Sequence, residues 1–331
     1  MYRVYQLMNR VIDIRFNERT NQSAITEFIL VGLTDSLEQQ ILLFWVFTLI
    51  YSVAMAGNCL LIVTIASCKK LHTPMYFLLT NLSLLNMFSI SVTTPKLLQT
   101  LSTHTKTISF YGCVAQAYFF IFALGSELLL LSIMAFDRYA AICHPLQYAS
   151  IMRKEVCIGM AAGRVIGMVY SALHTGFMLQ LSFCSSNIVN HFFCDLLPLL
   201  KLSCSDTSRN EALIFVADVF FGMGSCGLTL TSYFFILRAI FQIRSNEGKK
   251  KAFSTCSSHL LVVSFYFSAV IYTYIRPSSV SSIDNDKLVS LLYSVVTPVV
   301  NPIIYSLRNK EVKEALKALT RRGRLIQGSQ S

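Results

Sequence analysis

The chain has 331 residues, of which 54% are hydrophobic and 14% charged, and its formal net charge is +11 at pH 7. This composition is too apolar for a soluble domain, in which about a quarter of the residues are charged. No nucleic-acid-binding motif accompanies the positive charge, so we expect no nucleic acid among the partners.

Residues 1–40 form the expected extracellular tail. The tail lacks the apolar core of about 7–15 residues that a cleaved signal peptide needs, and translation could begin at Met1 or Met8. Asn21 begins an N-glycosylation triplet, Asn-Gln-Ser, in this exposed segment. The same kind of triplet at Asn81 lies within an expected membrane span, where glycosylation is excluded.

Seven apolar stretches follow, each long enough to cross a bilayer, which takes about 20 helical residues. The spans are expected at roughly 41–68, 73–97, 107–142, 156–181, 211–240, 250–275 and 286–308. Lipid offers no water to the backbone, so the spans must be helices. The predicted fold class is therefore an all-α membrane protein, with a seven-helix bundle over 41–308.

Basic residues set the expected orientation of this bundle. They occur between spans one and two, before spans four and six, and after span seven, all on one side, and basic loops remain cytoplasmic. The N-terminus is then extracellular, and the protein is expected in the plasma membrane. In the cytoplasmic tail, 309–331, Val312, Leu316 and Leu319 share one helical face, which predicts a short amphipathic helix on the membrane lipids.

Four of the ten cysteines fall on the expected outer side, where oxidation is allowed. They are Cys113, Cys184, Cys194 and Cys204. The sequence alone permits three pairings of four cysteines.

The third span ends in MAFDRYAAIC (Met134–Cys143), which places an acid and a base, Asp137 and Arg138, at the inner membrane face. Charged groups in such a position are costly and indicate a functional element. Other motifs follow the same order as in one known family: LHTPMYFLLTNLS (Leu71–Ser83), HFFCDLLPLLKLSCSDT (His191–Thr207), Ser232-Tyr233, KAFSTCSSHL (Lys251–Leu260) and PVVNPIIYSLRN (Pro298–Asn309). With them the chain resembles the odorant receptors, a branch of the rhodopsin-like G-protein-coupled receptors.

The resemblance implies a receptor for small, volatile, mainly hydrophobic odorants that activates a stimulatory G protein and raises cyclic AMP, with no cofactor. It also implies the disulfides Cys113–Cys194 and Cys184–Cys204. The residues expected to couple to the G protein and rearrange on activation are Asp137, Arg138, Tyr139, Tyr233, Asn301, Pro302 and Tyr305. In the resting state Arg138 would be held by Asp137 and by polar groups on span six, such as Ser254 or Thr255.

The family's ligand pocket lies in the outer halves of spans three, five and six. Carried over to this chain, its lining would be Phe120, Ile121, Leu124, Gly125, Ala217, Asp218, Phe221, Val270, Ile271 and Tyr274. Asp218 is an acid within a span, which is by default a functional-site hypothesis. It could accept a hydrogen bond from a ligand, pair with an amine, or be neutral and bonded to a nearby side chain.

Three positions depart from the family pattern. Asn86 replaces an acid that would form a sodium site with Glu127, so only a remnant of that site is expected and no metal. Phe267-Ser268 stands where the family has Tyr-Gly. Arg164 replaces a tryptophan in span four, where an arginine costs about 2.5–3.5 kcal/mol on insertion scales. Arg164 could be tolerated there or could impair folding.

Other functional classes are less well supported. Gly222–Gly227 matches the dinucleotide pattern G-x-G-x-x-G, but it lies in an apolar span without a preceding strand, so we do not expect an enzyme. Glu127 and Asp218 could line a transport path, yet no internal repeat of the kind found in transporters occurs. A non-olfactory chemosensory role for an odorant-type receptor stays open.

Overall fold

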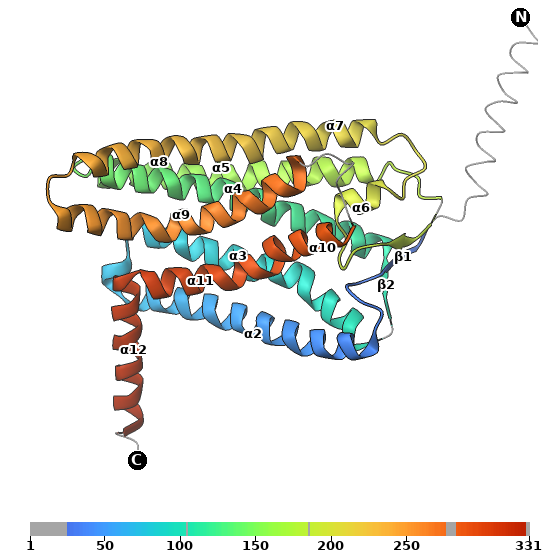
Figure 1. Cartoon of the computed structure of the whole chain (residues 1–331), viewed down its shortest axis with the longest axis horizontal. Coiled ribbons are helices and arrows are strands. Elements are labelled where there is room, and N and C mark those ends of the chain that lie inside the picture. The colour runs from blue at the N-terminus through green and yellow to red at the C-terminus, as the bar shows by residue number, and fades with distance from the viewer. Residues whose placement is uncertain (1–24, 104, 185, 276–282, 329–331) are drawn as a thin grey trace, which may run out of the picture.

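The computed structural model describes residues 25–103, 105–184, 186–275 and 283–328 of the chain. Within them, long helices run side by side as one bundle (Figure 1). Five of these are unbroken: α2 (Leu37–Ser67), α3 (Pro74–Ser102), α4 (Phe110–Cys143), α5 (Tyr148–Met178) and α9 (Asn246–Ile275). A one-turn 3₁₀ helix, η1 (Lys69–Leu71), connects α2 to α3.

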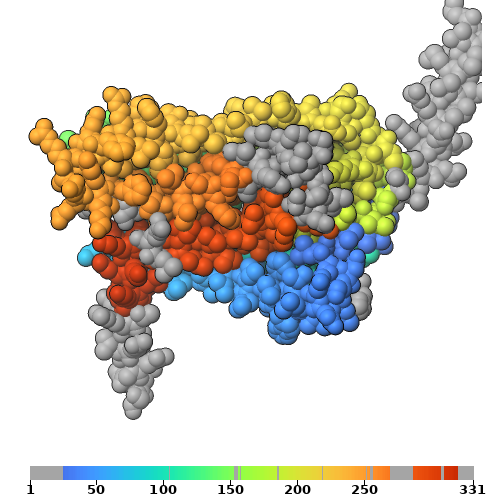
Figure 2. Space-filling model, viewed as in Figure 1, coloured from blue at the N-terminus to red at the C-terminus, as the bar shows by residue number. Residues whose placement is uncertain are grey.

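Two further long helices of the bundle each contain a π-helical segment. In the first, η2 (Asp218–Met223) joins α7 (Ser208–Ala217) to α8 (Gly224–Gln242). In the second, η4 (Leu292–Val296) joins α10 (Ile283–Leu291) to α11 (Thr297–Arg308). Such π segments are rare inside helices and often mark functional sites. Figure 2 shows the red segment of α10 and α11 between α2 and α9, where it closes the bundle.

The distribution of side chains is that of a protein bathed in lipid. On α2, Leu42 and Trp45 are 64% and 65% exposed, whereas Asn58 and Thr64 on the same helix are fully buried. Apolar residues thus face outward and polar residues inward. Within the described residues, five helical segments are long and apolar enough to cross a membrane: 37–67, 74–102, 110–143, 208–242 and 286–306. The bundle therefore has the expected all-α membrane architecture.

A small sheet covers the outer end of the bundle. Strand β1 (Glu27–Leu30) pairs antiparallel with β2 (Thr107–Ser109) and parallel with β3 (Ile188–Val189). The short helix α6 (Leu196–Leu200) follows β3. Phe28 and Leu30 of β1 are buried against this loop. We call this sheet, with the loop 179–207, the lid.

At the opposite end, α12 (Lys310–Gly328) turns away across the bundle axis (Figure 1). The Tyr76 hydroxyl of α3 lies 2.6 Å from Glu311 Oε2, to which it donates, and 3.2 Å from Asn309 Oδ1. Val312 is fully buried against the bundle. The expected helix after the seventh span is therefore present and anchored to α3.

The helix bounds differ from the expected spans at several ends. The third span was expected from residue 107, but Thr107–Ser109 form strand β2, because their backbone groups bond to β1. The fourth was expected over 156–181, whereas α5 begins at Tyr148 and ends at Met178. Its first turns extend beyond the apolar stretch, and its last expected residues belong to the lid.

Candidate functional site

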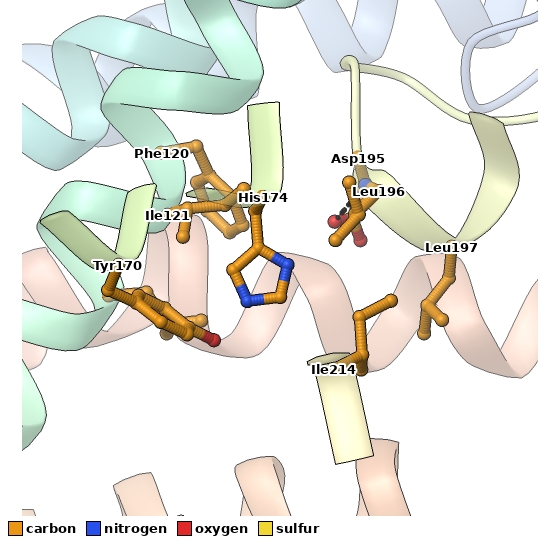
Figure 3. Close-up of a pocket in the computed structure, with 9 residues that line it drawn as sticks. Phe120, Ile121, Tyr170, His174, Asp195, Leu196, Leu197 and Ile214 are labelled. Carbon is orange, nitrogen blue, oxygen red and sulfur yellow. Dashed lines mark hydrogen bonds between the residues drawn. The ribbon is translucent and has the colours of Figure 1, made fainter. Parts of the chain in front are cut away.

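A pocket lies beneath the lid, between α4, α5, α6 and α7 (Figure 3). It is lined by Phe120, Ile121, Leu124, Tyr170, His174, Asp195, Leu196, Leu197 and Ile214. Its cavity volume is only about 20 Å³, room for a water molecule or two. A larger ligand must therefore displace the lining side chains.

The apolar wall of the pocket is held from behind by aromatic packing. The ring of Phe120 on α4 lies 4.7 Å from that of Phe193 in the lid and 5.9 Å from that of Tyr293 in η4. Tyr170 of α5 packs at 4.7 Å on Phe221 of η2. These contacts connect four segments of the bundle around one apolar cavity.

The polar wall consists of His174 from α5 and Asp195 from the lid. His174 is only 2% exposed, and its Nε2 has no hydrogen-bond partner among the described residues. Its ring meets that of Tyr170 edge to face, with the ring centres 4.5 Å apart. Asp195 caps α6, and its Oδ1 accepts a hydrogen bond of 2.7 Å from the Leu196 N–H. Figure 3 shows the His174 ring between Tyr170 and the Asp195 carboxyl.

Close packing of α5 on α4 brings His174 to the pocket. A side chain at Gly167 would meet Ser126 Oγ at 2.8 Å, so the helices can approach this closely only with glycine at that position. One turn later the Ser171 hydroxyl donates to the Tyr118 carbonyl at 2.5 Å. His174 follows Ser171 by one turn of the same helix and therefore lies beside α4.

The lid is fixed over the pocket by both expected disulfides, Cys113–Cys194 and Cys184–Cys204. Next to the first, the Cys194 N–H donates to Gln116 Oε1 at 2.9 Å. Gln116 in turn donates through Nε2 to the Val92 carbonyl of α3, also at 2.9 Å. The lid is thus tied to α4 by a disulfide and a hydrogen bond, and Gln116 connects this point of α4 to α3.

Two titratable groups of the lid are shifted in opposite directions. Burial lowers the pKa of His191 to about 3, and the nearby Lys287 ammonium acts in the same direction. Burial raises the pKa of Asp195 to about 6, and the Asp286 carboxylate adds to this, while the Leu196 N–H opposes it. Both groups are therefore mainly uncharged at mildly acidic pH, and Asp195 is mainly ionised at neutral pH.

Only part of the expected pocket can be placed. Phe120, Ile121 and Leu124 line the pocket, and Phe221 supports its wall through Tyr170. Gly125 is buried beside the Tyr170 ring, and Ala217 is buried in α7 without lining the pocket. The side chains of Asp218, Val270, Ile271 and Tyr274 lie outside the described part of the structure.

At the inner end of α4 lies a buried charged cluster. Arg138 is 6% exposed and donates from Nη2 to Oδ2 of the adjacent Asp137. The Tyr148 hydroxyl at the start of α5 donates to the other oxygen, Oδ1, at 2.7 Å. Tyr139 points away from this pair. Its ring lies 5.9 Å from that of Phe235 on α8, and its hydroxyl lies 3.1 Å from Nε2 of His144, the residue after α4. Ser254 and Thr255, the span-six candidates for holding Arg138, lie outside the described side chains.

Tyr233 connects α8 to α9 close to this cluster. Its hydroxyl lies 2.7 Å from His259 Nδ1 and 3.3 Å from the Cys256 carbonyl. Tyr305 of α11 is also buried, but its hydroxyl has no hydrogen-bond partner among the described residues. The two tyrosines thus differ: one bonds across helices, and the other has an unused hydroxyl in the core.

Three asparagines form a chain of hydrogen bonds in the bundle core. Asn301 Nδ2 donates to Asn86 Oδ1 at 3.2 Å, and Asn86 Nδ2 donates to Asn58 Oδ1 at 3.3 Å. Asn58 also donates at 2.9 Å to the Pro298 carbonyl, which lies four residues before Pro302 in α11 and which Pro302, lacking an N–H, cannot bond. Asn86 therefore uses both ends of its amide to join three helices, in the position where the family's sodium pair has an acid.

Glu127 of α4 is buried near this chain, with Tyr266 and Asn301 as neighbours. Its Oε1 has no hydrogen-bond partner among the described residues. A single acid without the second carboxylate is a poor match to the oxygen-rich, anionic sites that hard cations prefer. The remnant of the sodium site is thus one acid in an amide network.

Arg164 finds a partner that its sequence position did not reveal. Its Nη2 donates to Asn81 Oδ1 of α3 at 2.7 Å. Asn81 itself also donates to the Phe77 carbonyl of its own helix at 2.9 Å. Arg164 is exposed on the outer face of α5, and the hydrogen bond to Asn81 offsets part of the cost of its charge in the membrane.

The fold defines the class of protein first. The structure matches that of squid rhodopsin with a TM-score of 0.65, covering 86% of this chain and 85% of that one at 13% sequence identity. At this identity the likeness shows the fold, which is the seven-helix bundle of rhodopsin.

Sequence comparison then gives the family. The olfactory receptor family matches residues 47–322. The chain is 48% identical to human olfactory receptor 13A1, over 91% of this chain and 92% of that one. It is 47% identical to human olfactory receptor 5F1, over 92% and 98%, and 48% identical to the chicken olfactory receptor-like protein COR5, over 90% and 96%. This chain belongs to the olfactory receptor family and is a multi-pass membrane protein.

Membership of this family is at odds with the two rival classes. The relatives carry the names of receptors, not of enzymes or transporters. The glycine-rich stretch Gly222–Gly227 lies in η2 and α8, so it is helical and cannot form the phosphate-binding loop of a dinucleotide site.

Proposed function

We propose that this receptor binds small, mainly hydrophobic odorants in the pocket under the lid and activates a stimulatory G protein, raising cyclic AMP. One observation carries the proposal: a single helix, α4, lines the pocket with Phe120 and presents the buried Arg138 at its other end. At 1.5 Å per residue these positions are about 27 Å apart along the helix. Ligand and G protein would thus bind to opposite ends of one element.

The proposed direction of signalling follows from the contacts of α4. Arg138 is held by Asp137, whose second oxygen is bonded by Tyr148, and Tyr233 bonds α8 to α9 next to it. These bonds contribute about 1 kcal/mol each, or up to about 3 where a charge is involved. A ligand that favours an arrangement without them by a few kcal/mol would shift the balance between the two states. In that arrangement Arg138, with Asn301, Pro302 and Tyr305 of α11, would be rearranged toward the G protein.

The proposed orientation has the lid outside the cell and α12 on the cytoplasmic surface. Both disulfides lie at this end: Cys113–Cys194 joins α4 to the lid and Cys184–Cys204 lies within the lid, as an oxidising exterior allows. The basic residues Lys69, Lys70, Lys249 and Lys250 and the start of α12 lie at the opposite end, as expected for cytoplasmic loops. Asn21, the proposed glycosylation site, lies outside the described residues.

The test is a cyclic AMP assay in cells that express the chain with an olfactory stimulatory G protein. An odorant panel is applied, and only cells stained for an extracellular N-terminal tag are counted. The proposal predicts that at least one small apolar odorant raises cyclic AMP and that Arg138→Ala abolishes the response at unchanged staining. Equal responses in Arg138→Ala and the unmodified receptor would contradict the coupling role, and staining only after permeabilisation would contradict the orientation.

A further inference from the structure

The polar wall of the pocket contains two side chains that can hydrogen-bond to a ligand, His174 and Asp195. Only 2% of the His174 surface is exposed, and its Nε2 has no hydrogen-bond partner among the described residues. Leaving such a polar atom without a partner is unfavourable. His174 lines the pocket, so a ligand that displaces the neighbouring side chains could reach this atom and supply its missing partner.

Asp195 supplies the second group. Its Oδ1 is occupied by the Leu196 N–H at the start of α6, so the cap fixes where the carboxyl points. The carboxyl lines the same cavity as His174 and faces it in Figure 3. Because Oδ1 accepts the capping bond, the other oxygen, Oδ2, is the one that can accept a hydrogen bond from a ligand.

The rest of the lining limits what can bind. Phe120, Ile121, Leu124 and Ile214 are apolar, and the cavity has a volume of only about 20 Å³. A ligand must displace some of these apolar side chains, and its polar group can then reach His174 and Asp195, which line the same cavity. Tyr170 also lines the cavity, and its ring packs against those of His174 and Phe221.

We propose that His174 and Asp195 select ligands with a hydroxyl group, so that this receptor prefers alcohols over carbonyl compounds of the same carbon skeleton. The hydroxyl hydrogen is donated to the Asp195 carboxylate, and the hydroxyl oxygen accepts a hydrogen bond from the His174 ring. An aldehyde or ketone brings only an acceptor, which meets the carboxylate unfavourably. A carboxylate ligand is excluded by like charge. The inference rests on the proposed function for the location of the site and adds the chemical class.

The experiment measures binding without signalling. The purified full-length receptor is heated in detergent with matched ligands: hexanol, hexanal and hexanoate, and cyclohexanol and cyclohexanone. The concentration of each that gives half-maximal thermal stabilisation is compared. We expect the alcohols to act at concentrations about tenfold lower than their carbonyl partners, as expected for one hydrogen bond to a charged group.

Two variants identify the groups responsible. Asp195→Asn keeps an oxygen that can cap α6, but its amide donates hydrogen bonds, so the preference for alcohols should disappear or reverse. His174→Phe keeps a ring against Tyr170 and should weaken alcohol binding about tenfold while hexanal is little affected. Asp206→Asn is the matched control, because Asp206 is an exposed acid of the lid that bonds to Ser208 away from the pocket.

Three results would overturn the inference: carbonyl compounds binding as tightly as the alcohols, Asp195→Asn leaving the preference unchanged, or no alcohol of the panel stabilising the receptor. Selective binding of alcohols without any cyclic AMP response would leave the inference standing and contradict the proposed function. Cyclic AMP responses to odorants without a preference for the hydroxyl group would support the proposed function and contradict the inference.

Discussion

The two ends of this bundle are stabilised by different kinds of bond. At the outer end, two disulfides and a three-stranded sheet fix the lid over the pocket. At the inner end, among the described residues, the helices are joined by side-chain hydrogen bonds centred on Asp137, Tyr148 and Tyr233 and by packing. A disulfide contributes about 2–4 kcal/mol and cannot exchange partners, whereas a hydrogen bond contributes about 1 kcal/mol and can. The difference indicates a fixed outer end for recognition and an inner end that can rearrange.

The largest effect is expected from opening the lid. Cys113→Ser removes the disulfide to Cys194 and should destabilise the receptor by about 2–5 kcal/mol, enough to abolish most surface expression. Surface staining of an N-terminal tag measures this. Cys59→Ser is the control, because Cys59 is an exposed free cysteine of α2 and should have little effect. Normal surface levels of Cys113→Ser would show that the lid does not depend on the covalent bond.

Much of this outer–inner division was predictable from the sequence. The span pattern predicted the bundle, and the motifs predicted the pairing of the lid cysteines and the adjacent pair Asp137 and Arg138. In these cases the signal is local: a run of apolar residues, neighbouring residues, or a motif shared with a family. The π segments η2 and η4 were not predictable, because they depend on how the helices pack.

The groups that the sequence did not reveal are those that meet only in the folded chain. His174 and Asp195 come from a span and a loop, and neither has a local pattern that marks it as a pocket residue. A lone histidine in an uncharged stretch was the available signal for His174. The same reason applies to Asn81, the partner of Arg164, since α3 and α5 are far apart in sequence.

Acid sensitivity separates two groups within the lid. Folding lowers the pKa of His191 from 6.5 to about 3. Between these pH values the unfolded chain binds a proton that the folded chain does not, so stability falls as the pH falls below about 6.5. Folding raises the pKa of Asp195 from 3.8 to about 6. Between these pH values the folded chain binds a proton that the unfolded chain does not, so stability rises as the pH falls below about 6. The two effects oppose each other in the unmodified receptor.

Replacing either residue should reveal the pH dependence of stability that the other one causes. Between about pH 7 and pH 5, Asp195→Asn should lose about 2 kcal/mol of stability, while the unmodified receptor loses less than about 1. His191→Gln should instead gain about 1 kcal/mol over the same interval. Thermal unfolding of the purified proteins at both pH values checks this. Identical pH profiles for all three proteins would refute the opposing shifts.

A smaller effect is expected at the bond between α3 and α5. Asn81→Ala leaves the Arg164 guanidinium without its partner and should cost about 1–2 kcal/mol, seen as reduced surface staining. In the background of Arg164→Trp the same change should cost much less, because no charge needs a partner. Thr80→Ala is a control on the same helix, since the Thr80 hydroxyl bonds to the Tyr76 carbonyl of its own helix. Equal losses in both backgrounds would show that Asn81 does not act through Arg164.

The smallest effect is expected from one hydroxyl at the inner end. Tyr233→Phe removes the bonds to His259 and Cys256 that join α8 to α9, and this should favour their separation by about 1 kcal/mol. Basal cyclic AMP per surface receptor should then rise up to about fivefold. Tyr111→Phe, at a position 79% exposed at the outer end, should leave it unchanged. A fall in basal signalling would mean that the bond belongs to the active state.

The most direct test of whether the outer end recognises the ligand and the inner end couples to the G protein is to measure ligand binding and cyclic AMP in parallel for one variant at each end. Arg138→Ala should retain thermal stabilisation by the activating odorant and lose the cyclic AMP response, with Asp137 still bonded by Tyr148. For an activating alcohol, His174→Phe should shift both binding and the cyclic AMP response to about tenfold higher concentrations, in proportion. If Arg138→Ala instead abolished ligand binding, or left signalling intact, the separation of a recognising outer end from a coupling inner end would be contradicted.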